Sequence, residues 1–194
     1  MGFGLRGLTE EIKLAMTRYV ALLRAINVGG HTVKMETLQK LFVAMGYERV
    51  ETFIASGNVI FETARRNPIA LEETIAKGLE KALGFPVATF LRTIPELAAV
   101  AAHAPFPGSD LEPGASLYVG FMKNAVGREI MRAVAASRTA ADDFALHGRE
   151  LYWLRRNVGL ASIYSGARIE KTLAGPITMR NITTVRKLAA KYPE

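Results

Sequence analysis

Two short polar loops in the first half of the chain carry the side chains whose types and spacing could do chemistry. One loop spans residues 24–34 and the other is Ser56-Gly57-Asn58, and each follows an apolar segment typical of a buried strand. Their cationic, amide and hydroxyl groups suit the binding of an anion, and the glycines let backbone N–H groups turn toward it. The candidate ligand-binding residues in these loops are Arg24, Asn27, Gly29, Gly30, Lys34, Ser56, Gly57 and Asn58.

Each loop also has a purely structural interpretation. Gly29-Gly30 with Lys34 at the start of a helix is typical of a phosphate-binding loop, but the spacing does not match GxxxxGK[ST], which excludes a Walker loop. A plain strand-to-helix connection would use the same glycines, because glycine adopts positive φ at low cost. A tight hairpin turn would equally explain Ser56-Gly57-Asn58. His31 could act as a general base, although a surface histidine explains it as well.

A second concentration of polar groups lies near the C-terminus. Asn181 is predicted to cap a helix with Thr184 at its third position, which would by itself explain the asparagine. Residues 149–194 carry nine Lys and Arg against three Glu, nearly all of the net charge of +7. This surplus suits a phosphorylated ligand or nucleic acid, although a solvated helix face has the same composition. Further candidate ligand-binding residues are Arg180, Asn181, Thr184 and Lys187.

Aromatic and acidic residues in the second half leave further alternatives. Tyr152 and Trp153 are followed by basic residues, so they could stack on bases or pack into a core. Asp142 and Asp143 are neighbours on a predicted strand or loop, where successive side chains face apart. We therefore expect both carboxylates to be solvated and not to form a catalytic pair.

Composition limits the class of protein. With 194 residues, 49% hydrophobic and 22% charged, the chain is long and apolar enough for a folded core. The absence of cysteine excludes disulfides and thiolate nucleophiles, and the three histidines lack metal-ligand spacing, so no metal or cofactor is expected. No apolar stretch approaches the ~20 residues of a membrane helix. Residues 1–15 carry charges where a signal peptide would be apolar, which favours a cytoplasmic protein with a short N-terminal extension before Met16.

The apolar periodicity predicts an α+β protein of two ferredoxin-like modules packed together, with an extra C-terminal helix. The first module, within residues 16–92, has the order βαββαβ; residues 93–194 hold a linking helix, a second module of order βαββα and the last helix. The expected strands are 18–23, 50–55, 59–63, 87–91, 116–121, 144–147 and 150–154, and the expected helices are 35–45, 68–83, 94–102, 125–136, 162–173 and 181–191.

This topology predicts where the two loops lie. In a ferredoxin-like sheet the first two strands are parallel with the third between them, so both loops should meet at one edge, about 10 Å apart. The strand over residues 19–24 is apolar on both faces, so we expect the second module to cover the first sheet. A covered sheet argues against an RNA-recognition motif, whose aromatic signature is also absent.

Three motifs follow one another along the chain: YVALLRAINVGG at residues 19–30 with Lys34-Met35, TFIASGNVIF at residues 52–61, and Thr-x-Arg-Asn-x-x-Thr-Val-x-Lys-Leu at residues 178–188. They resemble the bacterial family called domain of unknown function 1697. The resemblance implies a cytoplasmic α+β protein of ferredoxin-like modules and implies no activity. The chain departs from the family pattern at Ser162-Ile163, where Ser-Lys is usual, and at Ile182, where tryptophan is usual.

Three function classes remain open at this level. The first is a protein that binds an anionic, phosphate-bearing small molecule or nucleic acid. The second is an enzyme acting on a phosphorylated metabolite, with Arg24 and Lys34 holding the anion and polar side chains orienting it, although no general base is evident. The third is a structural interaction protein. The sequence leaves the oligomeric state open.

Overall fold

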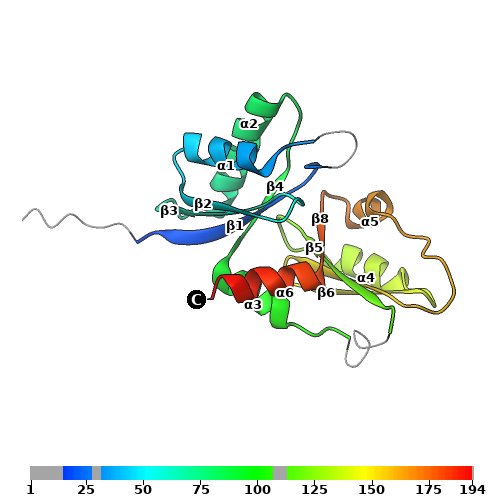
Figure 1. Ribbon diagram of the computed structural model, residues 1–194. Helices are drawn as coiled ribbons and strands as arrows, with labels where there is room; N and C mark the ends of the chain where they lie inside the picture. Colours follow the sequence, from blue (N-terminus) through cyan, green and yellow to red (C-terminus); the bar gives the residue numbers. More distant parts are fainter. Residues whose placement is uncertain (1–14, 28–31, 107–112, 194) are drawn as a thin grey trace, which may run out of the picture.

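Two four-stranded antiparallel sheets form the framework of the protein (Figure 1). The computed structural model describes residues 15–27, 32–106 and 113–193; of the expected extension, all but Ala15 lies outside these ranges. The first module has the strand order β2-β3-β1-β4. Its elements are β1 (Thr17–Leu23), α1 (Met35–Ala44), β2 (Glu48–Phe53), β3 (Asn58–Thr63), α2 (Pro68–Leu83) and β4 (Thr89–Thr93).

The second module repeats this topology in the order β6-β7-β5-β8, after the linking helix α3 (Ile94–Ala102). The strands are connected as in the first module, which confirms two ferredoxin-like modules and the final helix. Its elements are β5 (Ser116–Phe121), α4 (Arg128–Ala136), β6 (Asp142–His147), β7 (Glu150–Arg155), α5 (Gly166–Leu173) and β8 (Thr178–Asn181), followed by α6 (Ile182–Lys191).

The strand β8 is the main element that the sequence reading missed. It has only four residues, pairs with β5 and passes directly into α6. The sequence predicts only the helix at 181–191 here, because a strand this short has no visible alternation of polar and apolar residues. The second module is therefore a complete βαββαβ unit. The helices α4 and α5 also begin later than predicted, at Arg128 and Gly166.

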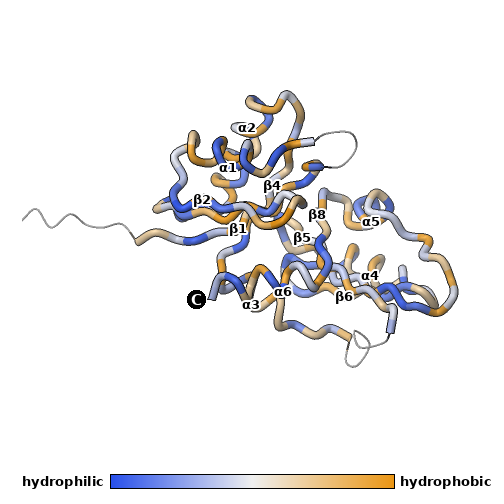
Figure 2. Tube along the Cα trace, in the orientation of Figure 1, coloured by the Kyte–Doolittle hydropathy of each residue, from blue (hydrophilic) through white to orange (hydrophobic). Residues whose placement is uncertain are grey.

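Local chemistry explains the helices that were predicted correctly. The Asn67 side chain accepts a hydrogen bond from Ala70 N at the start of α2, Pro68 occupies the first turn, and Gly84 ends the helix with φ of 79°. The alternation of hydrophobic and hydrophilic residues along α1 and α6 in Figure 2 marks amphipathic helices that bury one face. Within the described parts of the chain, every helix falls short of the length and apolarity needed to cross a membrane.

The two modules share one core between their sheets. Val20, Ile60 and Phe90 of the first sheet belong to the same buried cluster as Val119 and Tyr152 of the second. The helices α3 and α6 lie side by side and contribute to this cluster (Figure 1). Each module keeps a separate core beneath its own two helices. The expectation that the second module covers the open face of the first sheet is thus confirmed.

Buried side chains on β6 and β7 resolve two alternatives left by the sequence. Tyr152 and Trp153 are both buried, one in the shared core and one in the core of the second module, so neither forms a stacking surface. The prediction that Asp142 and Asp143 are solvated was wrong. Asp142 is fully buried and accepts hydrogen bonds from Trp153 Nε1 and Ser162 Oγ, at 2.9 and 2.6 Å. Asp143 forms ion pairs with two arginines.

Candidate functional site

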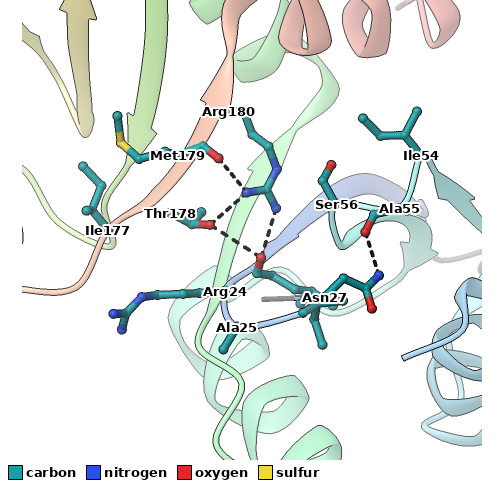
Figure 3. Close-up of a pocket in the computed structure, with 12 residues that line it drawn as sticks. Arg24, Ala25, Asn27, Ile54, Ala55, Ser56, Ile177, Thr178, Met179 and Arg180 are labelled. Atoms are coloured by element: carbon teal, nitrogen blue, oxygen red, sulfur yellow. Dashed lines mark hydrogen bonds between the residues drawn. The ribbon is translucent and has the colours of Figure 1, made fainter. Parts of the chain in front are cut away.

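A cleft of about 580 Å³ lies where the β1–α1 loop, the β2–β3 turn and β8 meet (Figure 3). The first two segments come from the edge of the first sheet at which the sequence placed them together, so that prediction is confirmed. The third comes from the second module, which makes the cleft an inter-module feature. The lining residues are 23–27, 54–56 and 177–180.

Asn27 fastens the two loops of the first module to each other. Its Nδ2 donates to the Ala55 carbonyl at 2.7 Å, while its Oδ1 accepts from Val33 N at 2.8 Å. Asn27 adopts φ of 57°, a left-handed conformation that asparagine tolerates better than most residues. With both ends of its amide bonded, this side chain shapes the cleft wall.

The conformation of the Ser56-Gly57-Asn58 turn, next to the cleft, is fixed by hydrogen bonds and by close packing. Asn58 is completely buried, and its Nδ2 donates to Phe53 O and to Ser56 Oγ, at 3.0 and 2.8 Å. Gly57 has φ of 71°, and a Cβ there would lie 3.0 Å from Ile26 Cβ, so only glycine fits without displacement. The Ser56 hydroxyl accepts from Asn58 and therefore keeps its own proton for another acceptor.

Arg180, on β8, places a buried guanidinium in the cleft wall. The residue is 7% exposed, and all of its N–H groups donate to neutral oxygens at 2.7 to 3.4 Å. No carboxylate of the described residues forms an ion pair with it. Burial lowers the pKa of Arg180 to about 10, which leaves it charged at neutral pH. The accepting oxygens belong to Asn58, Thr178, Met179, Leu23 and Gly57.

Arg92, on β4, is a second buried arginine, and its partner differs from those of Arg180. It is 1% exposed, and its Nε lies 2.6 Å from Glu150 Oε1 of the other module. Burial lowers the pKa of Arg92 and the Glu150 carboxylate opposes that shift. Because an uncompensated buried charge is costly, a paired arginine is the expected arrangement. Arg180 lacks such a partner among the described residues.

Arg24 lines the outer part of the cleft and lies nearer to solvent. Its Nη2 is 2.9 Å from Glu170 Oε2, and its side chain is 45% exposed. The other oxygen of Glu170 accepts from Ile177 N at 3.0 Å, so this carboxylate joins α5 to the segment leading into β8. In Figure 3 the Arg24 side chain points away from Ser56 and Asn27. Its contact with Glu170 is exposed enough to be exchanged for a ligand.

The remaining predicted site residues lie elsewhere. Lys34 is exposed at the N-cap of α1 and does not line the cleft, and Gly29, Gly30 and His31 lie outside the described residues. Asn181 caps α6 as predicted, its Oδ1 accepting from Thr183 N at 2.8 Å. Asn181, Thr184 and Lys187 are not among the lining residues. Conversely, eight lining residues were not predicted: Leu23, Ala25, Ile26, Ile54, Ala55, Ile177, Thr178 and Met179. The last three lie in or next to β8, which was not recognised.

Unusual backbone conformations concentrate in the cleft wall. Among the described residues, five other than glycine have positive φ, and three of these are Ala25 at 67°, Asn27 at 57° and Ile54 at 51°. All three line the cleft. A left-handed isoleucine is the most unfavourable of these, because its branched Cβ crowds the backbone. Strain of this kind clusters at ligand sites.

Together, the fold and the cleft define an α+β protein whose two ferredoxin-like modules meet around a partly apolar, cationic hollow. The chain belongs to the family described as protein of unknown function (DUF1697), whose model matches residues 16–152. The structure is similar to that of the conserved bacterial protein SP0830 from Streptococcus pneumoniae, with a TM-score of 0.73 and 23% sequence identity. That similarity covers 91% of this chain and 98% of the other and concerns the fold. No curated protein matches the chain.

Proposed function

We propose that the protein binds a small anionic, phosphate-bearing molecule in this cleft. The observation that carries the proposal is the buried Arg180 guanidinium, which lines the cleft and is bonded to neutral oxygens alone. A buried cation in a low-dielectric wall attracts an anion more strongly than an exposed one. A bound anion would supply the charge that the described residues do not.

Arg180, Arg24 and Ser56 would contribute to binding in different ways. Its N–H groups are all engaged, so Arg180 acts through its charge, while Arg24 and the Ser56 hydroxyl can donate directly to the ligand. Arg24 would exchange the Glu170 carboxylate for the anion. This arrangement keeps the Arg180 network intact when the ligand leaves.

The nucleic-acid alternative receives less support from the basic C-terminal region. Arg156 pairs with Asp143 at 3.1 Å, and the two side chains are only 27% and 18% exposed. Arg155 lies over the Trp153 ring, whose own face is buried. Side chains held in this way are less available to follow a phosphate backbone. The contacts therefore favour a small ligand over a polyanion.

The catalytic alternative also receives less support. The lining residues include no carboxylate and no imidazole, and the described part of the cleft thus offers no conventional general base. A binding role needs only the charge and the hydrogen-bond donors that the cleft contains. We therefore propose binding in preference to catalysis of a phosphorylated metabolite.

The test measures binding of inorganic phosphate by isothermal titration calorimetry. We expect Arg24→Gln and Arg180→Gln each to weaken binding by about tenfold or more, since each removes a charged partner. Arg180→Lys keeps the charge and should retain most of the affinity, which separates the loss of charge from the loss of the hydrogen-bond network. Thermal melts establish that each variant is folded.

Lys187→Gln is the matched control, because it removes one positive charge from an exposed position on α6 outside the cleft. It should leave phosphate binding unchanged. The same variants are titrated with a labelled 20-nucleotide single strand. If the oligonucleotide binds and Lys187→Gln weakens it more than Arg24→Gln does, the nucleic-acid alternative replaces the proposal. If the unmodified protein binds neither inorganic phosphate nor a phosphate monoester, the proposal is contradicted outright.

A further inference from the structure

We infer that the ligand of this cleft is amphipathic: a small soluble phosphate monoester whose anionic group faces Arg180 and whose apolar group lies against Ile54. This inference rests on the proposed function and adds the chemical class of the ligand. It depends on three independent features of the cleft, namely its size, its lining and the conformation of Ile54.

The size of the cleft exceeds what an inorganic anion needs. Sites for small organic ligands typically measure roughly 300–1,000 Å³, and the cleft measures about 580 Å³. A phosphate ion beside Arg180 would leave most of that volume to water. An organic group attached to the phosphate would fill it.

The lining is apolar over a large part of its extent. Seven of the twelve residues are alanine, leucine, isoleucine or methionine. Leu23, Ile26 and Ile177 are buried in the cores of the modules, so the accessible apolar side chains of the first module are those of Ala25, Ile54 and Ala55. In Figure 3 the Thr178 hydroxyl lies at the Arg180 guanidinium, whereas Ile54 projects from the β2–β3 turn on the other side of Ser56. Charge at one place and apolar surface at another match a ligand with a charged head and an apolar body.

Ile54 provides the third observation. It is 51% exposed, so burial in the core does not explain an isoleucine here. Its φ of 51° is a conformation that glycine or asparagine would adopt with less strain. An exposed isoleucine in a strained backbone conformation reduces stability. Contact with an apolar group of the ligand would explain why an isoleucine stands at this position.

The experiment compares three probes by calorimetry: inorganic phosphate, n-hexyl phosphate and 1-hexanol. Partial burial of the hexyl chain should make hexyl phosphate bind about tenfold more tightly than inorganic phosphate. Hexanol should bind far more weakly than hexyl phosphate, because it lacks the charge that Arg180 attracts. Equal affinities for inorganic phosphate and hexyl phosphate would overturn the inference while leaving the proposed function intact.

The variant Ile54→Gly tests the apolar contact. We expect it to reduce the advantage of hexyl phosphate over inorganic phosphate by about fivefold, since the apolar side chain is gone. Its melting temperature should not fall, because glycine relieves the strain. Ala174→Gly is the matched control: Ala174 also has positive φ, at 53°, but does not line the cleft, so its substitution should leave the ratio of affinities unchanged.

The remaining outcomes separate the two proposals. If neither phosphate probe binds, both the proposed function and this inference fail. If hexyl phosphate binds but Ile54→Gly leaves its advantage unchanged, the assigned apolar contact is wrong. A phosphate group on an apolar chain also occurs at lipid surfaces, so sedimentation with phosphatidylcholine vesicles containing phosphatidic acid serves as a further arm. Co-sedimentation with these vesicles, together with weak binding of hexyl phosphate, would overturn a soluble ligand.

Discussion

At the scale of single residues, the two buried arginines differ in how their charge is balanced. Arg92 has Glu150 as a partner across the two modules, and truncating either would leave a buried charge unpaired. Arg180 instead relies on Asn58 and on backbone carbonyls. The Arg92–Glu150 ion pair joins the two modules, and the two charges balance each other. The hydrogen bonds of Arg180 also join the modules, but its charge remains available to the cleft.

Glu170 gives the residue-scale prediction. Its carboxylate is the acid that pairs with Arg24, so Glu170→Gln should strengthen the binding of inorganic phosphate by a few fold, roughly the effect of one partly exposed ion pair. The amide oxygen of glutamine can still accept from Ile177 N, so the fold should be preserved. Calorimetry measures the change. Glu36→Gln, on the exposed face of α1, is the control and should have no effect; weaker binding by Glu170→Gln would contradict the exchange at Arg24.

At the scale of elements, the sequence predicted those whose signals are local. The bounds predicted for α2, 68–83, are those of the structure, where Pro68 lies in the first turn and Gly84 ends the helix. The bounds predicted for α3, 94–102, are also correct, and its first turn carries a capping box. The strand β8 was missed because its four residues are defined by pairing with β5, which is not a local property. The part of the cleft wall built by β8 was missed for the same reason. Arg180 was selected for its charge, but its burial follows from tertiary packing that the sequence does not display.

Gly57 provides the element-scale prediction, since the β2–β3 turn depends on it. Gly57→Ala combines a positive φ with a Cβ only 3.0 Å from Ile26 Cβ, and should destabilise the protein by about 2–3 kcal/mol. Gly84→Ala is the matched control, with φ of 79° and no heavy atom within 4 Å of the added Cβ, and should cost about 1 kcal/mol. Urea unfolding measures both. Equal losses would show that the close approach of Ile26 contributes nothing.

At the scale of the whole molecule, the packing of two modules brings together groups that are far apart in the chain. His103, at the end of α3, stacks on His147, at the end of β6, with ring centroids 4.3 Å apart, and Tyr152 lies at 5.0 Å from His103. Burial lowers the pKa of His103, and the charge of protonated His147 lowers it further, while Glu150 opposes both effects. The contact between the linking helix and the second module therefore favours the neutral imidazole.

This pair predicts how stability depends on pH. Since the pKa of His103 is lower in the folded state than its usual value of 6.5, its contribution is fully present above pH 6.5 and is lost as the pH falls from there through the folded-state value. Apart from Glu72, whose pKa is raised by burial, carboxylates titrate near pH 4, so a fall in melting temperature between pH 6.5 and 5.5 reports mainly on histidine. His103→Gln should flatten the profile, and His147→Gln should flatten it less, because burial is the larger cause of the shift. A profile for His103→Gln as steep as that of the unmodified protein would mean that the junction of the two modules does not sense the protonation of this histidine.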